Sequence, residues 1–206
     1  METSSNKTTL NAYENNVDKY VGGTPQEVSG FVKEWLDRAI EDLNSDSSII
    51  EIGSAFGRDA QYLENKGLKV ERTDATQAFV NLLNDQGYKA TNFNPLEQDF
   101  DRAYDLIFAN AVLLHFTREE AELALEKMFD ALSPGGKIAI TLKKGDGEAW
   151  SEAKVDTPRF FCYWQEDQII KLLEKIGYKN IDLLNGDDER AEHQDQKWIR
   201  LVAYKD

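Results

Sequence analysis

Cysteine and histidine are scarce in this sequence of 206 residues, and their scarcity excludes several kinds of site. Cys162 is the only cysteine, so the chain has no intrachain disulfide and no multi-cysteine zinc site. The two histidines are His115 and His193, and His193 lies in a highly charged segment where it is expected to be solvated. We therefore expect no metal centre. A single cysteine suits a reducing compartment, and a cytoplasmic location is expected.

Long apolar runs and excess positive charge are also missing. No apolar run approaches the roughly 18 residues of a membrane-spanning helix, and the N-terminus has no apolar segment of the signal-peptide type, so we expect no membrane association. The 24 basic residues are outnumbered by 38 acidic ones, and the resulting net charge of −14 repels phosphate backbones. Nucleic acid is therefore disfavoured as a partner.

The length suits one domain whose hydrophobic core needs no covalent staples. With 4 prolines and 13 glycines, the composition is not that of a disordered or collagen-like chain. We expect a single domain over residues 1–206, in which 1–45 form an N-terminal helical cap and 47–204 form a core of sheet and helices. The sequence leaves the oligomeric state open.

The strongest helix pattern near the N-terminus covers residues 24–43, whereas residues 1–9 are polar and are expected to fray. Thr24 is a candidate N-cap, and Glu27 completes a capping box. Apolar residues then recur at helical spacing, so this helix is expected to pack on a sheet.

From Ser47 onwards, short apolar runs alternate with helical patterns. Strands are expected at residues 47–53, 68–74, 88–93, 104–110, 137–142, 178–184 and 197–204. Helices are expected at residues 58–66, 76–86, 117–132 and 165–177, and the third of them has Thr117 as its N-cap and Glu120 as the capping-box partner.

This alternation predicts a parallel sheet with helices on both faces. No helix separates the last two strands, so they are expected to form a hairpin in which one strand runs antiparallel. The expected fold class is therefore α/β: a seven-stranded, mostly parallel, doubly wound sheet with a C-terminal antiparallel hairpin strand.

The loop after the first strand carries the main functional motif. Ligands of an open α/β sheet bind at the carboxyl ends of the strands, and this loop reads EIGSAFG from Glu51 to Gly57. Gly53 permits a tight turn, and Gly57 permits a close approach of the backbone to a ligand. Asp74 ends the second strand about 20 residues further on, where a carboxylate can accept both hydroxyls of a ribose. The spacing differs from that of dinucleotide-binding and NTP-binding loops.

With this motif the chain resembles the class I S-adenosylmethionine-dependent methyltransferases over about residues 47–204. The loop of that family has an acidic residue and three spaced glycines, present here as Glu51, Gly53, Ala55 and Gly57, so that alanine replaces the middle glycine. SPGGKIAI before the fifth strand, ANAVLLHF after the fourth and the terminal hairpin are also similar to that family. The resemblance implies a Rossmann-like methyltransferase that binds S-adenosyl-L-methionine and releases S-adenosyl-L-homocysteine.

The resemblance also implies roles for the residues around this cofactor. The loop from Gly53 to Gly57, including Ser54 and Ala55, would pass beneath its amino acid part, and Glu51 would reach the ammonium group or support the loop. Further residues would contact the ribose (Asp74), the adenine (Ala75 and Asn94), and the methionine with its transferring methyl (Asn110 and Ala111). Arg58 would pair with the cofactor carboxylate or remain a surface arginine.

Four residues are candidates for the acceptor side. His115 follows the fourth strand and is either a general base or a residue that packs beneath the cofactor. Tyr13 and Tyr20 either fold over the site or pack their rings on the surface. Arg159 lies in the aromatic segment TPRFFCYWQEDQ, and it either binds an anionic acceptor or forms a structural ion pair. Cys162 in the same segment is expected in the core.

The expected function is methyl transfer from S-adenosylmethionine to oxygen or nitrogen of a small molecule by direct in-line displacement. A short N-terminal segment leaves room for a modest lid, which favours a small-molecule acceptor. Two alternatives stay open: a methyltransferase that acts on a protein or peptide side chain, and a module that binds the cofactor without catalysis. A short-chain nicotinamide reductase is disfavoured, because its Tyr-x-x-x-Lys pair is missing at a suitable position.

Overall fold

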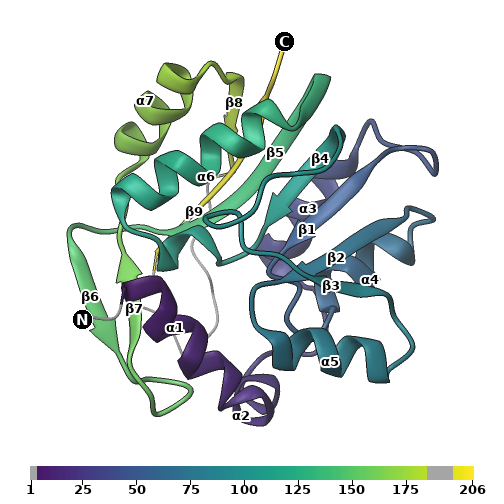
Figure 1. Cartoon of the computed structure of the whole chain (residues 1–206). Coiled ribbons are helices and arrows are strands. Elements are labelled where there is room, and N and C mark those ends of the chain that lie inside the picture. The colour runs from purple at the N-terminus through teal and green to yellow at the C-terminus, as the bar shows by residue number, and fades with distance from the viewer. Residues whose placement is uncertain (1–3, 185–196) are drawn as a thin grey trace.

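The computed structural model describes residues 4–184 and 197–206, and its centre is a seven-stranded sheet in the order β3-β2-β1-β4-β5-β9-β8 (Figure 1). The strands are β1 (Ile49–Ile52), β2 (Val70–Asp74), β3 (Ala90–Asn92), β4 (Tyr104–Ala109), β5 (Leu132–Lys143), β8 (Lys179–Leu183) and β9 (Trp198–Tyr204). Neighbouring strands from β3 to β5 pair in parallel, whereas β9 runs antiparallel to both β5 and β8. The predicted fold class, with its antiparallel hairpin strand, is confirmed.

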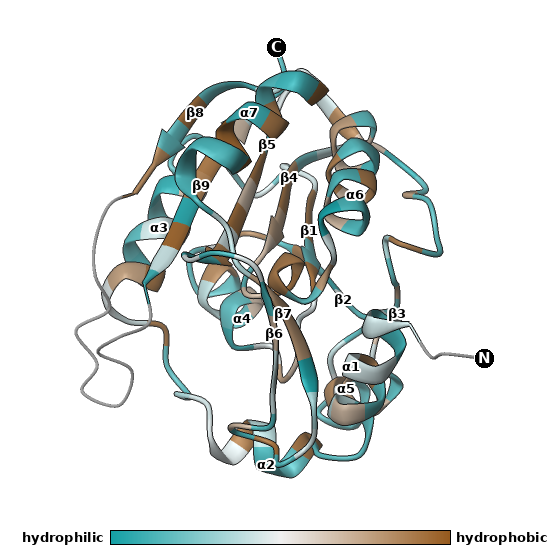
Figure 2. Cartoon of the chain, turned by 90° about the vertical axis from the view of Figure 1, so that its left-hand side faces the viewer, coloured by the Kyte–Doolittle hydropathy of each residue, from teal (hydrophilic) through white to brown (hydrophobic). Residues whose placement is uncertain are grey.

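Helices cover both faces of the sheet. Helices α3 (Gly30–Ile40) and α4 (Arg58–Glu64) pack on one face, and α6 (Arg118–Asp130) and α7 (Glu166–Ile176) pack on the other. Helix α5 (Gln77–Asp85) packs beside β3 at the edge. Figure 2 shows the hydrophobic residues concentrated on the central strands, which are buried on both faces as expected for a doubly wound sheet.

The predicted cap of α6 is confirmed, because Thr117 and Glu120 form a reciprocal capping box. The end of this helix lies earlier than predicted: α6 ends at Asp130, and the segment SPGG lies inside β5. No helix in the described ranges is long and apolar enough to cross a membrane.

Two features of the N-terminal segment differ from the prediction. Helix α3 begins at Gly30 with Ser29 as its N-cap, and the Thr24 hydroxyl does not cap it but donates a 2.6 Å hydrogen bond to the Tyr20 carbonyl. Residues 5–9 were expected to fray, but they form the start of helix α1 (Ser5–Glu14), which is followed by α2 (Val17–Gly22). The buried face of α1 includes the polar residues Asn6 and Thr9, so this helix depends on tertiary contacts and not on an apolar stripe.

A small second sheet of β6 (Glu148–Ser151) and β7 (Arg159–Cys162) was not predicted. Every residue of β7 is buried, because α1 covers the strand. Cys162 is fully buried, as predicted for a core residue.

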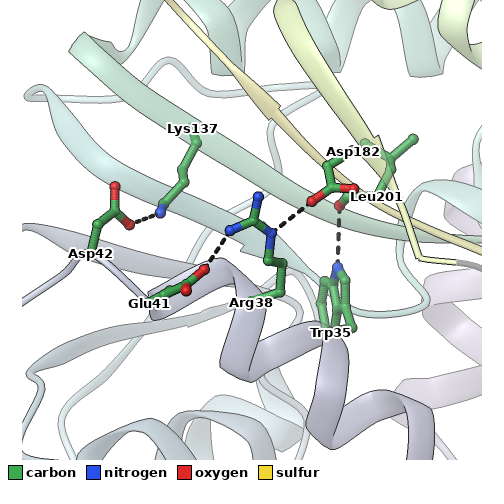
Figure 3. A network of polar contacts seen from close by, with 7 residues as sticks. All are labelled: Trp35, Arg38, Glu41, Asp42, Lys137, Asp182 and Leu201. Atoms are coloured by element: carbon green, nitrogen blue, oxygen red, sulfur yellow. Dashed lines mark hydrogen bonds and ion pairs between the residues drawn. The ribbon is translucent and has the colours of Figure 1, made fainter.

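Polar contacts attach α3 to three strands of the sheet (Figure 3). The indole nitrogen of Trp35 donates to the Leu201 carbonyl at 3.2 Å, and Arg38 donates to the Asp182 carboxylate at 2.6 Å. Lys137 of β5 is buried and forms an ion pair with Asp42, just beyond the helix. Helix α3 is therefore part of the core layer, whereas α1 and α2 lie together at one end of the molecule, with α1 beside α5 (Figure 1).

Candidate active site

The loop after β1 needs unusual backbone conformations. Gly53 has a φ of 76°, and a Cβ atom there would lie 2.4 Å from the Cγ2 atom of Val112. Gly57 has a φ of 83° and is the N-cap of α4. Ala55, which replaces the middle glycine, adopts the same left-handed region with a φ of 48°. Ala55 therefore adopts a conformation that favours glycine, and the missing side chain of Gly53 lets Val112 pack against the backbone of the loop.

Asp74 joins this loop to the end of β2. One carboxylate oxygen accepts the backbone N–H of Ala55 at 2.8 Å, and the other accepts the N–H of Thr76 at 2.8 Å. Burial raises the pKa of Asp74 to about 6, although both amide contacts act against that rise. Each carboxylate oxygen retains a further acceptor site, so Asp74 can also accept hydrogen bonds from a ligand.

Glu51 supplies a buried carboxylate at the end of β1. It is 2% exposed, and its Oε2 atom has no hydrogen-bond partner in the part of the chain that the structure describes. Burial and the neighbouring Asp59 carboxylate raise the pKa of Glu51. A buried oxygen without a donor costs free energy, so this position fits a ligand that brings a donor such as an ammonium group.

A chain of hydrogen bonds connects the start of α4 to the ends of β4 and β5. Asp59 accepts from Arg58 at 2.7 Å and from the side-chain amide of Asn110 at 2.7 Å. The Asn110 carbonyl oxygen accepts from the Thr141 hydroxyl at 2.8 Å, and that hydroxyl accepts the N–H of Ala111 at 2.8 Å. Arg58 is thus an ordered, mostly buried residue whose side chain is only 13% exposed, and Asn110 is held at both ends of its amide.

Two adjoining hollows lie over this loop. A cavity of about 80 Å³ contains Tyr13, Tyr20, Gly53, Ala55, Asp74, Ala75, Asn94, Asn110, Ala111 and His115 among its lining residues. A larger hollow of about 550 Å³ contains Tyr20, Glu51, Gly53, Ser54, Ala55, Arg58, Asn110 and Ala111 among its lining residues. Gly57 and Arg159 do not line these two hollows: Gly57 is the N-cap of α4, and Arg159 donates to the hydroxyl of Tyr13, which is a lining residue. The structure therefore brings nearly all of the predicted residues to one place.

Helix α1 contributes lining residues that the sequence pattern did not reveal. Asn6 accepts a 3.2 Å hydrogen bond from the side-chain amide of Asn94, and the Thr9 hydroxyl accepts the N–H of Phe160 at 3.0 Å. Both residues line the smaller cavity together with Tyr13. Asn6, Thr9 and Tyr13 are spaced by three and four residues, which places them on one face of a helix. This spacing is the sequence signal from which Asn6 and Thr9 could have been predicted as lining residues.

His115 is engaged at both ring nitrogens. Its Nδ1 atom lies 2.6 Å from the Phe160 carbonyl oxygen, which can only accept, so Nδ1 carries the proton. Nε2 then accepts from the Tyr13 hydroxyl at 2.8 Å, and Tyr13 in turn accepts from Arg159 at 3.0 Å. Burial lowers the pKa of His115 to about 3, so the ring is neutral at ordinary pH.

The two predicted tyrosines lie in one aromatic cluster over the cavity. Tyr13 and Tyr20 meet edge-to-face with ring centroids 5.3 Å apart, and Tyr20 meets Phe79 of α5 at 5.4 Å. Burial raises the pKa of both hydroxyls. Neither ring packs merely on the outer surface, since both line the cavity.

The residues that the structure describes contain no group of three or more histidine, cysteine, aspartate or glutamate side chains arranged to hold a metal ion. His193, the residue expected to be solvated, lies outside the described ranges.

The chain is similar to known methyltransferases. A family profile described as a methyltransferase domain matches residues 26–183. The phosphoethanolamine N-methyltransferase of Plasmodium falciparum is 28% identical over 107 residues, which make up 48% of this chain and 40% of that protein.

Solved structures show the same fold. Phosphoethanolamine N-methyltransferase 2 of Haemonchus contortus, in complex with S-adenosyl-L-methionine, matches with a TM-score of 0.76 at 14% identity over 99% of this chain and 60% of that chain. The 1,6-didemethyltoxoflavin-N1-methyltransferase of Burkholderia thailandensis, with S-adenosylhomocysteine bound, matches with a TM-score of 0.72 at 16% identity over 100% and 91%. The chain thus spans less than two thirds of the length of either phosphoethanolamine enzyme.

Proposed function

The chain belongs to the family of methyltransferase domains, and on this premise we propose that it transfers a methyl group from S-adenosylmethionine to nitrogen or oxygen of a small molecule. One observation carries the proposal: an unpaired carboxylate oxygen at Glu51, the backbone of Gly53 and a second buried carboxylate at Asp74 line adjoining hollows. Glu51 complements an ammonium group, the backbone of Gly53 complements the amino acid part of the cofactor, and Asp74 complements the ribose hydroxyls.

The other residues around the hollows receive roles by the same argument. We propose that Ser54, Ala55 and Gly57 shape the loop, that Ala75 and Asn94 flank the adenine, and that Asn110 and Ala111 line the methyl group. Arg58 remains a candidate for the cofactor carboxylate, although it already donates to Asp59 and to the Pro25 carbonyl. We also propose that residues 1–206 act as one methyltransferase domain. Helices α1 and α2 of the N-terminal segment 1–45 supply the cap, whereas α3 of that segment packs on the core formed by residues 47–204.

When bound, the cofactor supplies an electrophilic methyl group that the acceptor atom can take by in-line displacement. The residues of the chain align the acceptor and exclude water, and both effects lower a reaction barrier without proton transfer. Tyr13, Tyr20 and Arg159 lie on the acceptor side. His115 acts as a positioning residue for Tyr13, because both of its nitrogens are engaged and its pKa is about 3.

This arrangement favours nitrogen over oxygen as the acceptor atom. A neutral amine attacks through its lone pair without first losing a proton, whereas a hydroxyl group generally needs a base with a pKa near the working pH. His115 does not meet that requirement. The relatives named above are N-methyltransferases for phosphoethanolamine and for 1,6-didemethyltoxoflavin, which supports a small nitrogen acceptor.

Calorimetry with S-adenosylhomocysteine, followed by a methyl-release screen over small amines, alcohols and thiols, tests the proposal. We expect saturable binding and turnover with at least one amine class. Absence of binding to the folded protein would refute the cofactor assignment. Tight binding with no turnover on any acceptor would favour a non-catalytic binding module, and turnover only on peptides would favour a protein methyltransferase.

A further inference from the structure

The ring of Phe161 lies among three nitrogen-bearing side chains next to the acceptor side of the site. The Lys143 ammonium is 3.9 Å from the ring centroid, the carbon of the Arg159 guanidinium is 5.2 Å from it, and the His115 ring is centred 4.7 Å away. These residues come from β5, β7 and the short 3₁₀ helix Leu113–His115, so the cluster exists only in the folded chain.

The two cations of this cluster are not neutralised by the residues that the structure describes. Arg159 is 5% exposed and donates to the Tyr13 hydroxyl and the Ala153 carbonyl, but its Nε atom has no partner there. Lys143 forms no ion pair within the same ranges, in contrast to its neighbour Lys144, which lies 2.7 Å from the Glu166 carboxylate.

The electrostatics agree with this geometry. Burial and the positive charge of Arg159 lower the pKa of Lys143 to about 8. A buried positive charge without a counter-ion costs free energy. Arg159 is buried and Lys143 is half-buried, and both charges persist in a chain whose net charge is −14. An anion supplied by a ligand would remove this cost.

We propose that Lys143 and Arg159 bind an oxyanion group of the methyl acceptor, either a carboxylate or a phosphate, beside the Phe161 ring. The proposal rests on the proposed function and specifies its substrate class as small anionic acceptors. Arg159 supplies directional N–H donors and Lys143 supplies a compact charge. Because Arg159 also contacts Tyr13, an anion held here directs the rest of the acceptor towards the cavity that Tyr13 lines.

Calorimetry on protein saturated with S-adenosylhomocysteine tests this subsite, with inorganic phosphate and acetate titrated separately at pH 7. We expect Lys143→Gln to weaken binding of the preferred anion roughly tenfold to a hundredfold, because a charge-assisted contact is lost. Lys143→Arg should retain most of the binding. Lys144→Gln is the matched control and should bind like the wild type, since its partner is Glu166. The stronger of the two anions identifies the acceptor group.

The pH dependence gives a second measurement. Acetate affinity should fall as the pH rises through about 8, where Lys143 loses its proton, while Arg159 stays protonated and His115 stays neutral. Equal anion affinity in wild type and Lys143→Gln, or no anion binding to the S-adenosylhomocysteine complex, would overturn the proposal. Failure of S-adenosylhomocysteine itself to bind would instead contradict the proposed function, and the two failures are therefore distinguishable.

Discussion

Tyr13 donates a 2.8 Å hydrogen bond to His115 across a sequence separation of 102 residues. The direction of this bond is set by the Phe160 carbonyl, which leaves only Nε2 of the histidine free to accept. The bond attaches helix α1 to the segment just after β4 and closes one side of the cavity. It also means that His115 presents no free nitrogen to an acceptor.

The variant His115→Gln shows whether His115 positions Tyr13 or acts as a general base. We expect the methyl-transfer rate to fall together with S-adenosylhomocysteine affinity or melting temperature, while the pH–rate profile keeps its shape. Steady-state kinetics and calorimetry on the variant, with Tyr13→Phe as the companion, measure these effects. A base would behave differently: the rate would drop about 10²–10⁴-fold with affinity intact, and a limb near pH 6.5 would disappear.

The low pKa of His115 predicts an acid-sensitive fold. The unfolded chain binds a proton at His115 below about pH 6.5, whereas the folded chain does so only near pH 3. This contribution to stability is therefore complete above pH 6.5 and is lost as the pH falls towards 3. Between pH 7 and 5 the wild type should lose about 2 kcal/mol of unfolding free energy more than His115→Gln does. Urea titrations at both pH values measure this difference, and parallel losses would contradict it.

Asp74→Ala should weaken S-adenosylhomocysteine binding roughly tenfold to a hundredfold, because a charge-assisted contact worth about 1.5–3 kcal/mol is lost. The pKa of about 6 adds a pH signature, since the ionised carboxylate is the better acceptor. Wild-type affinity should decline as the pH falls below 6 and should level off at a loss no greater than that of Asp74→Ala, and this decline should be absent in Asp74→Asn. Asp85→Ala, at the end of α5, is a control away from the loop. Unchanged affinity in a folded Asp74→Ala variant would rule out the ribose assignment.

Gly53→Val should abolish S-adenosylhomocysteine binding while the sheet stays folded. The added side chain would resist a φ of 76° and would meet Val112 at a separation far below van der Waals contact. Gly87→Val is the matched control, because Gly87 has a φ of 89° but nothing within 4 Å of an added Cβ atom. Circular dichroism and calorimetry on both variants provide the measurement. Normal binding by Gly53→Val would show that the motif has been misplaced.

Much of the core and of the cofactor side could be predicted from the sequence because both depend on local patterns. The strands of the parallel sheet are short apolar runs buried on both faces, and their ends determine where ligands bind. Glu51, Gly53 and Asp74 were identifiable because a turn and two strand ends place them at fixed sequence intervals. The capping box of Thr117 and Glu120 is equally local.

Other features were decided only by tertiary structure. Helix α1 has a polar buried face, and its partners Asn94 and Phe160 are distant in sequence. The β6/β7 hairpin lies against that helix, and the Thr24 hydroxyl donates to the Tyr20 carbonyl and does not cap α3. The sequence placed His115 at the edge of the sheet, but its tautomer and its pKa depend on Tyr13, Phe160 and burial. Such contacts depend on how distant segments pack, and residue spacing along the chain carries no record of that packing.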